Sequence, residues 1–143
     1  MMAYVCVGAD DMAAAARFYT AILPALGYRM ERHRGDLSFL PDAAPGAPDF
    51  YVKAPFDGQP ATAGNGTMVA FEAADQRQVR ALHAAGVAAG GSDAGAPGFR
   101  ADYGPRFYVG YLRDPQGNKI ALFSSNSADP ARDDAARGGP QAD

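Results

Sequence analysis

The sequence predicts an α+β fold made of two similar modules related by pseudo-twofold symmetry. The first observation behind this prediction is that a strand, a capped helix and further strands occur in this order twice along the chain. The second is an internal repeat with an offset of about 64 residues, which indicates two packed units of one design. The residue pairs that match at this offset are Val5 with Val69, Val7 with Phe71, Ala9 with Ala73, Asp11 with Asp75, and Phe18 with Leu82.

The first module begins with an apolar run at residues 2–8 that has strand propensity. Asp10 or Asp11 then offers an N-cap for a helix. The Ala-rich stretch from Met12 to Leu23 predicts that helix, because its larger side chains recur at helical spacing and form one apolar face. Further strands of this module are expected at 28–33, 36–40 and 49–53, followed by a loop over 54–65.

The second module repeats this order. A strand is expected at 67–71, and Asp75 is again a candidate N-cap. Residues 76–85 predict a helix, which Gly86, Gly90 and Gly91 end. The glycine-rich stretch 90–98 predicts turns and lacks the GxxxxGK[ST] spacing of a phosphate-binding loop. The remaining strands are expected at 107–113 and 119–124.

These elements define a single domain at residues 1–125, with modules at about 1–55 and 64–125. The last stretch, 126–143, is rich in Ala, Asp, Gly and Pro. It has too few apolar side chains to bury, so we expect a disordered tail.

The composition excludes several classes of protein. The formal net charge is -3 and no two Lys or Arg residues are adjacent, which argues against nucleic acid binding. No apolar stretch is long enough to cross a membrane, and no signal peptide is visible at the start. Cys6 is the only cysteine, so we expect a cytoplasmic protein without an internal disulfide, and we expect Cys6 itself to be a small buried side chain.

Side chains alternate along a strand, so each predicted strand has a helix-covered face and an opposite face. Val7 and Phe71, in the first strands of the two modules, suit the helix side. Tyr4, Met68 and Ala121 then lie together on the opposite face, where we expect a pocket.

A tight turn is predicted at 114–118. Pro115 sets its φ angle, Asp114 can hydrogen-bond the turn backbone, and Gly117 or Asn118 can accept a positive φ angle. This turn resembles the most specific sequence signature of the vicinal oxygen chelate superfamily, also called the glyoxalase/bleomycin-resistance/dioxygenase proteins. Other segments that resemble this family, over about 2–124, are Phe18-Tyr19, Leu26-Gly27-Tyr28, His83-Ala84-Ala85-Gly86, Gly90–Arg100 and the strand from Tyr108.

The resemblance implies two βαβββ modules that form a curved mixed sheet around a pocket, and it implies a homodimer. Many members of this family hold a divalent metal in the pocket with His and Glu side chains. The positions that correspond to their metal ligands are Tyr4, Met68 and Ala121, and none of these is a usual ligand for Zn, Ni, Mn or Fe(II). We therefore expect no metal and no other cofactor.

Several side chains are candidates for binding a small molecule. Aromatic rings suit an apolar or aromatic ligand, and an arginine in the loop before strand 107–113 suits a carboxylate or phosphate. The candidate ligand-binding residues are Tyr4, Tyr51, Met68, Arg100, Tyr103, Tyr108 and Phe123. The alternative for the aromatic residues is that they only fill the space that metal and substrate occupy in other members. Glu72 is either a carboxylate at the pocket edge or the exposed end of a strand, and His83 is expected to pack a helix.

The sequence therefore predicts a metal-free glyoxalase-like protein that binds a small organic molecule. The alternative is an enzyme: a metal-independent lyase or isomerase acting beside a carbonyl group, or a metal-dependent lyase or dioxygenase whose ligands lie elsewhere.

Overall fold

The computed structural model describes residues 1–133, which form two consecutive modules. The first module contains β1 (Tyr4–Gly8), α1 (Met12–Ile22), the short 3-10 helix η1 (Pro24–Leu26), β2 (Arg29–His33), β3 (Asp36–Leu40) and β4 (Asp49–Lys53). The second module contains β5 (Met68–Glu72), α2 (Gln76–Ala88), β6 (Ser92–Phe99), β7 (Tyr108–Arg113) and β8 (Lys119–Ser124). Apart from η1 and β6, these are the elements that the sequence predicts.

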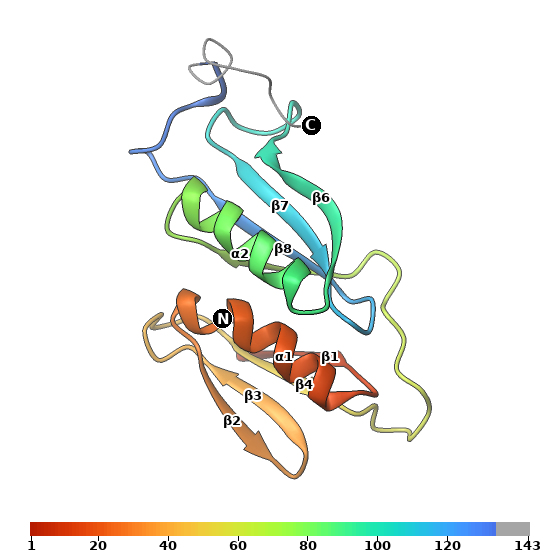
Figure 1. Ribbon diagram of the computed structural model, residues 1–143. Helices are drawn as coiled ribbons and strands as arrows, with labels where there is room; N and C mark the ends of the chain where they lie inside the picture. The colour runs from red at the N-terminus through yellow and green to blue at the C-terminus, as the bar shows by residue number, and fades with distance from the viewer. Residues whose placement is uncertain (134–143) are drawn as a thin grey trace.

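Each module contributes a four-stranded mixed sheet, and the two sheets have the same topology (Figure 1). The strand order is β1-β4-β3-β2 in the first sheet and β5-β8-β7-β6 in the second. In each sheet the first strand pairs in parallel with the last strand of its module, and the other pairs are antiparallel. The predicted repeat is confirmed. The two sheets stay separate, because β1 and β5 are edge strands that pair only within their own modules.

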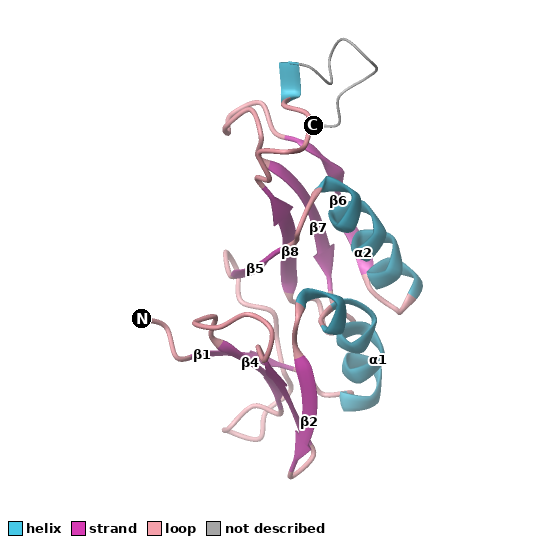
Figure 2. Ribbon diagram, turned by 90° about the vertical axis from the view of Figure 1, so that its left-hand side faces the viewer, coloured by secondary structure: helices cyan, strands magenta, loops and turns pink. Residues whose placement is uncertain are grey.

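Both helices cover the same side of the two sheets (Figure 2). Their inward faces bury side chains such as Phe18, Ile22 and Val79. The other side of each sheet, which we call the open face, has no helix over it, and Tyr4 and Met68 there are 59% and 45% exposed. The assignment of strand faces from side-chain alternation is therefore confirmed. Within residues 1–133, no helix combines the length and apolar character needed to cross a membrane.

Each helix begins after an aspartate that occupies the same place in the repeat. Asp11 accepts a hydrogen bond from the backbone N of Ala14 at 2.9 Å, and Asp75 accepts one from the backbone N of Gln78 at 2.7 Å. These carboxylates satisfy backbone N–H groups that have no partner inside the helix. Both N-cap predictions are confirmed, with Asp11 rather than Asp10 as the first cap.

The prediction that 90–98 forms only turns is wrong. Residues Ser92–Phe99 form β6, which pairs with β7 through two shifts of register around Gly95. A Cβ atom at Gly95 would lie 2.7 Å from Cδ2 of Tyr111, so the strand needs a glycine to approach its neighbour. The small residues that make this approach possible also remove the apolar alternation by which strands are recognised.

Phe18 of α1 fits against two glycines of the second module, Gly86 and Gly91, which we call the glycine slot. A Cβ atom would lie 3.2 Å from Cε2 of Phe18 if added at Gly86, and 2.4 Å from it if added at Gly91. The helix predicted over 76–85 extends three residues further, to Ala88, and Gly90 and Gly91 follow it as predicted. Gly86 fits inside the helix where a Cβ atom would also lie 2.7 Å from Cδ1 of Leu112 in β7.

The turn at 114–118 joins the two modules, and we call its contacts the turn bridge. Asp114 is only 4% exposed, and its carboxylate accepts hydrogen bonds from the Tyr19 hydroxyl at 2.6 Å and from the backbone N of Asn118 at 2.9 Å. The Asn118 side chain donates to the carbonyl oxygen of Gly8 at 2.8 Å. Tyr19 and Gly8 belong to the first module, so the signature turn fixes one module against the other.

A Tyr19→Phe variant is expected to lose less stability at alkaline pH than the wild-type protein. Burial, and then the neighbouring Asp114 carboxylate, raises the pKa of Tyr19 well above its usual value. Below about pH 10 the hydroxyl keeps its proton in both states, but above it the unfolded chain ionises first, so this group alone lowers stability by up to about 1.4 kcal/mol per pH unit. Urea unfolding of both proteins between about pH 8 and 11 measures the difference. Parallel stability curves would contradict the assignment.

Residues 126–133, which we expected to belong to a disordered tail, contact the start of α2. Asp129 accepts a hydrogen bond from the backbone N of Gln76 at 2.8 Å, and the Asn126 side chain donates to the carbonyl oxygen of Ala74 at 2.9 Å. The rest of the predicted tail, 134–143, lies outside the described residues.

Candidate functional site

Cross-strand pairing arranges the open face of the second sheet in rows of side chains. Three rows follow one another along β5, β8 and β7: Met68, Lys119 and Arg113; then Ala70, Ala121 and Tyr111; then Glu72, Phe123 and Val109. The middle row places two alanines side by side, which leaves room between the bulkier side chains at either end.

The open face of the first sheet carries a smaller aromatic group. The rings of Tyr4 and Tyr51 lie 5.4 Å apart, and the Tyr51 hydroxyl donates to Asp49 at 2.8 Å. This hydrogen bond, followed by partial burial, raises the pKa of Tyr51. Cys6 lies opposite Tyr51 in the register and is exposed, so the expectation of a buried cysteine is wrong. The strand is at a sheet edge and this face has no covering helix.

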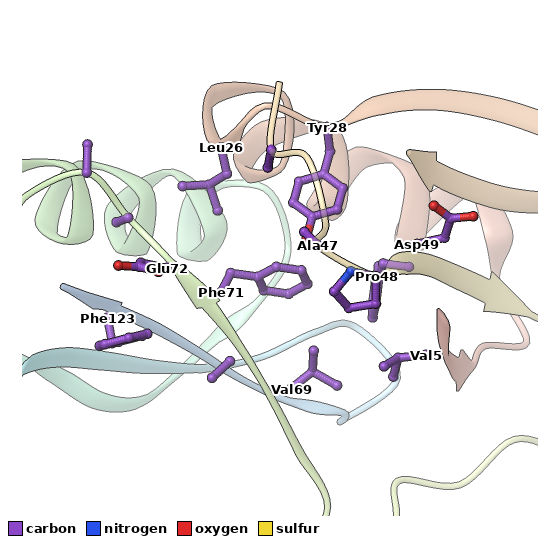
Figure 3. A pocket seen from close by; sticks show the side chains of 15 residues that line it. Val5, Leu26, Tyr28, Ala47, Pro48, Asp49, Val69, Phe71, Glu72 and Phe123 are labelled. Atoms are coloured by element: carbon purple, nitrogen blue, oxygen red, sulfur yellow. The ribbon is translucent and has the colours of Figure 1, made fainter. Parts of the chain in front are cut away.

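A pocket of about 540 Å3 lies where the two modules meet, and we call it the seam pocket (Figure 3). The edge strands β1 and β5 contribute Val5 and Val69 to its wall. Its aromatic lining comes from Tyr28, Phe50, Phe71 and Phe123, so both modules and both sides of the second sheet take part. An apolar concave site with few polar groups is typical of small-molecule binding.

Ring contacts fix the deep wall of the seam pocket. Phe71 of β5 meets Phe50 of β4 edge-to-face, with centroids 5.2 Å apart, and meets Tyr28 edge-to-face at 5.8 Å. Figure 3 shows Phe71 and Tyr28 turned toward each other from opposite modules. Because Phe50 and Phe71 are buried, this wall is held by the packing between the modules and is formed before any ligand binds.

Asp49 and Glu72 are the acidic residues of the seam pocket lining. Glu72 is the exposed last residue of β5 and also lines the pocket, so both alternatives from the sequence describe its position. Partial burial, and then the charge of Asp49, raises the pKa of Tyr28, so its hydroxyl stays protonated at neutral pH. The pocket therefore offers two carboxylate acceptors and a hydroxyl donor around an apolar interior, which can orient a ligand.

An aromatic chain connects the loop before β7 to the seam pocket. The ring of Tyr103 lies 4.9 Å from that of Phe107, which stacks on Phe123 at 5.6 Å. Tyr103 is 55% exposed, whereas Phe123 lines the pocket. Two of the predicted ligand-binding residues are thus linked through a third aromatic side chain, and the loop contacts the site through these rings.

The structure does not bring all the predicted residues to one place. Of the seven, only Phe123 lines the seam pocket. Tyr4 and Tyr51 lie on the first sheet and Met68 at the far end of β5, while the Arg100 side chain donates to the carbonyl oxygen of Ala96 at 2.8 Å. Tyr108 lies on the helix side of β7, buried against Phe99 and within reach of Arg80, so it is part of the core rather than of the open face.

Sequence reasoning missed Tyr111, Tyr28 and Phe71 as residues of interest. The signal for Tyr111 was available: the 114–118 turn pairs Arg113 with Lys119, and that register places Tyr111 beside Ala121 on the open face. The signal for Tyr28 and Phe71 was not available, because their pocket exists only where two modules meet.

The residues at the expected metal positions do not fit a divalent metal. Tyr4 lies in β1, Met68 supplies a thioether, and Ala121 supplies no donor atom, while Lys119 adds a positive charge beside Met68. His83 is engaged elsewhere, since its Nε2 lies 3.1 Å from Asp93 and 3.0 Å from the carbonyl oxygen of Tyr111. Among residues 1–133 there is no group of three or more His, Cys, Asp or Glu that could hold an ion.

The sequence matches a known family over most of its length. The profile of a family described as the glyoxalase-like domain matches residues 4–123. No curated protein matches the chain.

Solved structures share this architecture. A glyoxalase/bleomycin resistance protein from Albidiferax ferrireducens T118 is 37% identical, with a TM-score of 0.75, and the match covers 87% of this chain and 98% of that chain. A glyoxalase-related enzyme from Fulvimarina pelagi is 20% identical, with a TM-score of 0.68 over 100% of this chain and 97% of that one. A glyoxalase/bleomycin resistance protein/dioxygenase family enzyme from Burkholderia phytofirmans PsJN is 19% identical, with a TM-score of 0.67 over 87% and 98%. The last two show a common fold only.

Proposed function

This chain belongs to the glyoxalase-like family, and from that premise we propose that it binds a small, mainly apolar organic molecule in the seam pocket without a divalent metal. The observation that carries the proposal is the pocket itself, about 540 Å3 in volume and walled by aromatic side chains of both modules. Flat rings on its wall favour an aromatic or otherwise planar ligand. The carboxylates of Asp49 and Glu72 favour a ligand that presents hydrogen-bond donors toward them.

The metal-free part of the proposal rests on the donor atoms of the open face. Ala121 lies at the middle of the second sheet, where a metal-binding relative would need a side-chain ligand, and its neighbours Ala70 and Tyr111 do not replace it. Elemental analysis of the purified chain tests this directly. One tightly bound Zn, Ni, Mn or Fe ion per chain would contradict it.

An Ala70→Phe variant is expected to weaken ligand binding at the seam pocket by about tenfold or more. Ala70 is exposed and lines the pocket, so the added ring occupies ligand volume without entering the core. The probe is Nile red, an uncharged aromatic dye whose fluorescence reports an apolar environment, and the same titration follows its displacement by members of a fragment library.

The matched control is Ala84→Phe, which adds the same ring to an exposed position of α2 on the other side of the molecule. It is expected to bind the dye like the wild-type protein. If the two variants bind equally well, or if neither they nor the wild-type protein bind the dye or any fragment, the seam pocket is not the binding site.

Glu72 supports a second candidate function, an enzyme of the lyase or isomerase class. Its carboxylate lies at the edge of the pocket, where it can take a proton from a carbon beside a carbonyl group. Product analysis separates the two functions: a binding protein returns its ligand unchanged, whereas an enzyme converts it and loses that conversion in Glu72→Gln.

We further propose a cytoplasmic homodimer. The unpaired edges of β1 and β5 and the exposed side chains of Tyr4 and Met68 support an association that covers the open face. Light scattering coupled to size-exclusion chromatography measures the mass in solution, and a monomer at all concentrations would exclude the dimer.

A further inference from the structure

The first row of the open face, at the end of the second sheet remote from Glu72, concentrates positive charge. Pairing places Lys119 directly opposite Arg113 on one side and beside Met68 on the other. Like charges directly opposite each other destabilise a sheet. The chain as a whole carries a net charge of -3, so this pair is not part of a generally basic surface. An arrangement that costs stability in the free protein becomes favourable when an anion lies between the two charges.

Tyr111, in the next row, holds two cations against its ring. The Nζ atom of Lys119 lies 4.8 Å from the ring centroid, and Cζ of Arg100 lies 5.3 Å from it. Such contacts orient the charged groups without neutralising them. Arg100 is held further by its hydrogen bonds to the carbonyl oxygens of Ala96 and Phe99. The two positive groups are therefore placed by the fold rather than left free in solvent.

No carboxylate of the described part of the chain forms an ion pair with Lys119, Arg113 or Arg100. On the open face of the first sheet, by contrast, the Lys53 ammonium group lies 3.8 Å from the Asp36 carboxylate. Arg113 donates instead to the carbonyl oxygen of Gly117 at 2.8 Å, a contact that leaves its charge uncompensated. Three neighbouring cations thus lack an anionic partner within residues 1–133.

A hollow of about 580 Å3 is lined by two of these cations, Lys119 and Arg113. Met68, Lys119 and Arg113 form one wall, and the loop at 63–67 forms the other. This hollow and the seam pocket share no lining residue. We propose that it is an anion-binding site that takes the oxyanion group, a carboxylate or a phosphate, of a small molecule. Lys119 and Arg113 bind the oxyanion, and Tyr111 positions the Lys119 ammonium group beneath it.

The proposal is tested on the full chain at low ionic strength by NMR titration with inorganic phosphate and with benzoate, following the methyl group of Met68 and the ring of Tyr111. Both anions are expected to shift these signals with saturation below about 50 mM, and added salt is expected to weaken the binding. Benzamide, the uncharged counterpart of benzoate, is expected to leave them unchanged. No shift with either anion, or equal shifts with benzamide, overturns the proposal. Binding of one anion only identifies which oxyanion the site accepts.

Variants distinguish the role of the charged side chains from that of the Tyr111 ring that positions Lys119. Lys119→Gln and Arg113→Gln are each expected to lower the affinity for the anion by about tenfold. Lys53→Gln, the same change on the open face of the other sheet, is expected to have no effect. Tyr111→Phe keeps the ring and is expected to bind normally, whereas Tyr111→Leu removes it and is expected to weaken binding severalfold. If Lys53→Gln lowers the affinity for the anion as much as Lys119→Gln does, the effect comes from net charge and the proposed site is excluded.

Discussion

Replacing Asp114 with alanine is expected to lower the free energy of unfolding by about 3–5 kcal/mol. The buried carboxylate accepts hydrogen bonds from the Tyr19 hydroxyl, from the backbone N of Gln116 and Asn118, and from the Asn118 side chain. Alanine leaves these donors without their acceptor in a region that water does not reach freely, so the variant incurs the desolvation cost of several groups at once. Urea denaturation followed by circular dichroism measures the loss.

Asp57→Ala is the matched control for this prediction. Asp57 also accepts a hydrogen bond in a turn, from the backbone N of Gln59 at 3.0 Å, but it does so in an exposed loop. Its replacement is expected to change the free energy of unfolding by no more than about 0.5 kcal/mol. A loss as small as this in Asp114→Ala would show that the turn bridge does not hold the modules together.

The two largest effects expected on stability come from contacts between the modules, and this has a consequence for the site. The seam pocket has walls from both modules, and their relative position depends on the turn bridge and on the neighbouring contact of Phe18 with the glycine slot. A variant that loosens either contact is therefore expected to weaken ligand binding as well as folding. The sequence signature of the family acts on the pocket through this fixing of the modules.

The sequence predicted the elements of the fold well, for a physical reason. Helix caps, apolar periodicity and turn residues are local properties of a sequence. The hydrogen bonds that define the roles of Asp11, Asp75 and the 114–118 turn are made to residues three or four positions away. Strand β6 was not predicted because Gly95 is required by a close contact with Tyr111, a residue distant in sequence. A local sequence pattern does not show which small residues are required by a side chain that is close in space but distant in sequence.

The candidate site was predicted less completely. Alternation along single strands correctly assigned Tyr4, Met68 and Phe123 to the open face, because one face of each sheet is buried and the period is fixed. It did not assign Tyr108 and Tyr111, since a choice between adjacent residues needs the register with β8. The seam pocket depends on how two sheets are placed relative to each other, which no pattern within one module contains.

A Gly91→Ala variant is expected to lower the free energy of unfolding by about 3 kcal/mol. The new methyl group would lie 2.4 Å from Cε2 of Phe18 and 2.9 Å from two backbone oxygens, those of Arg113 and Gly86. The ring could be displaced only by disturbing a fully buried side chain, and the backbone oxygens belong to β7 and α2. Overpacking of this kind cannot be relieved by a change of rotamer alone.

Gly104→Ala provides the control, because a Cβ atom there meets nothing within 4 Å. That variant is expected to have unchanged or slightly higher stability, as fewer unfolded conformations remain available to alanine than to glycine. Equal stability of the two variants would mean that the modules can move apart at Phe18 without cost. A selective loss in Gly91→Ala, accompanied by weaker dye binding at the seam pocket, would show that the packing of Phe18 against Gly91 also sets the geometry of the pocket.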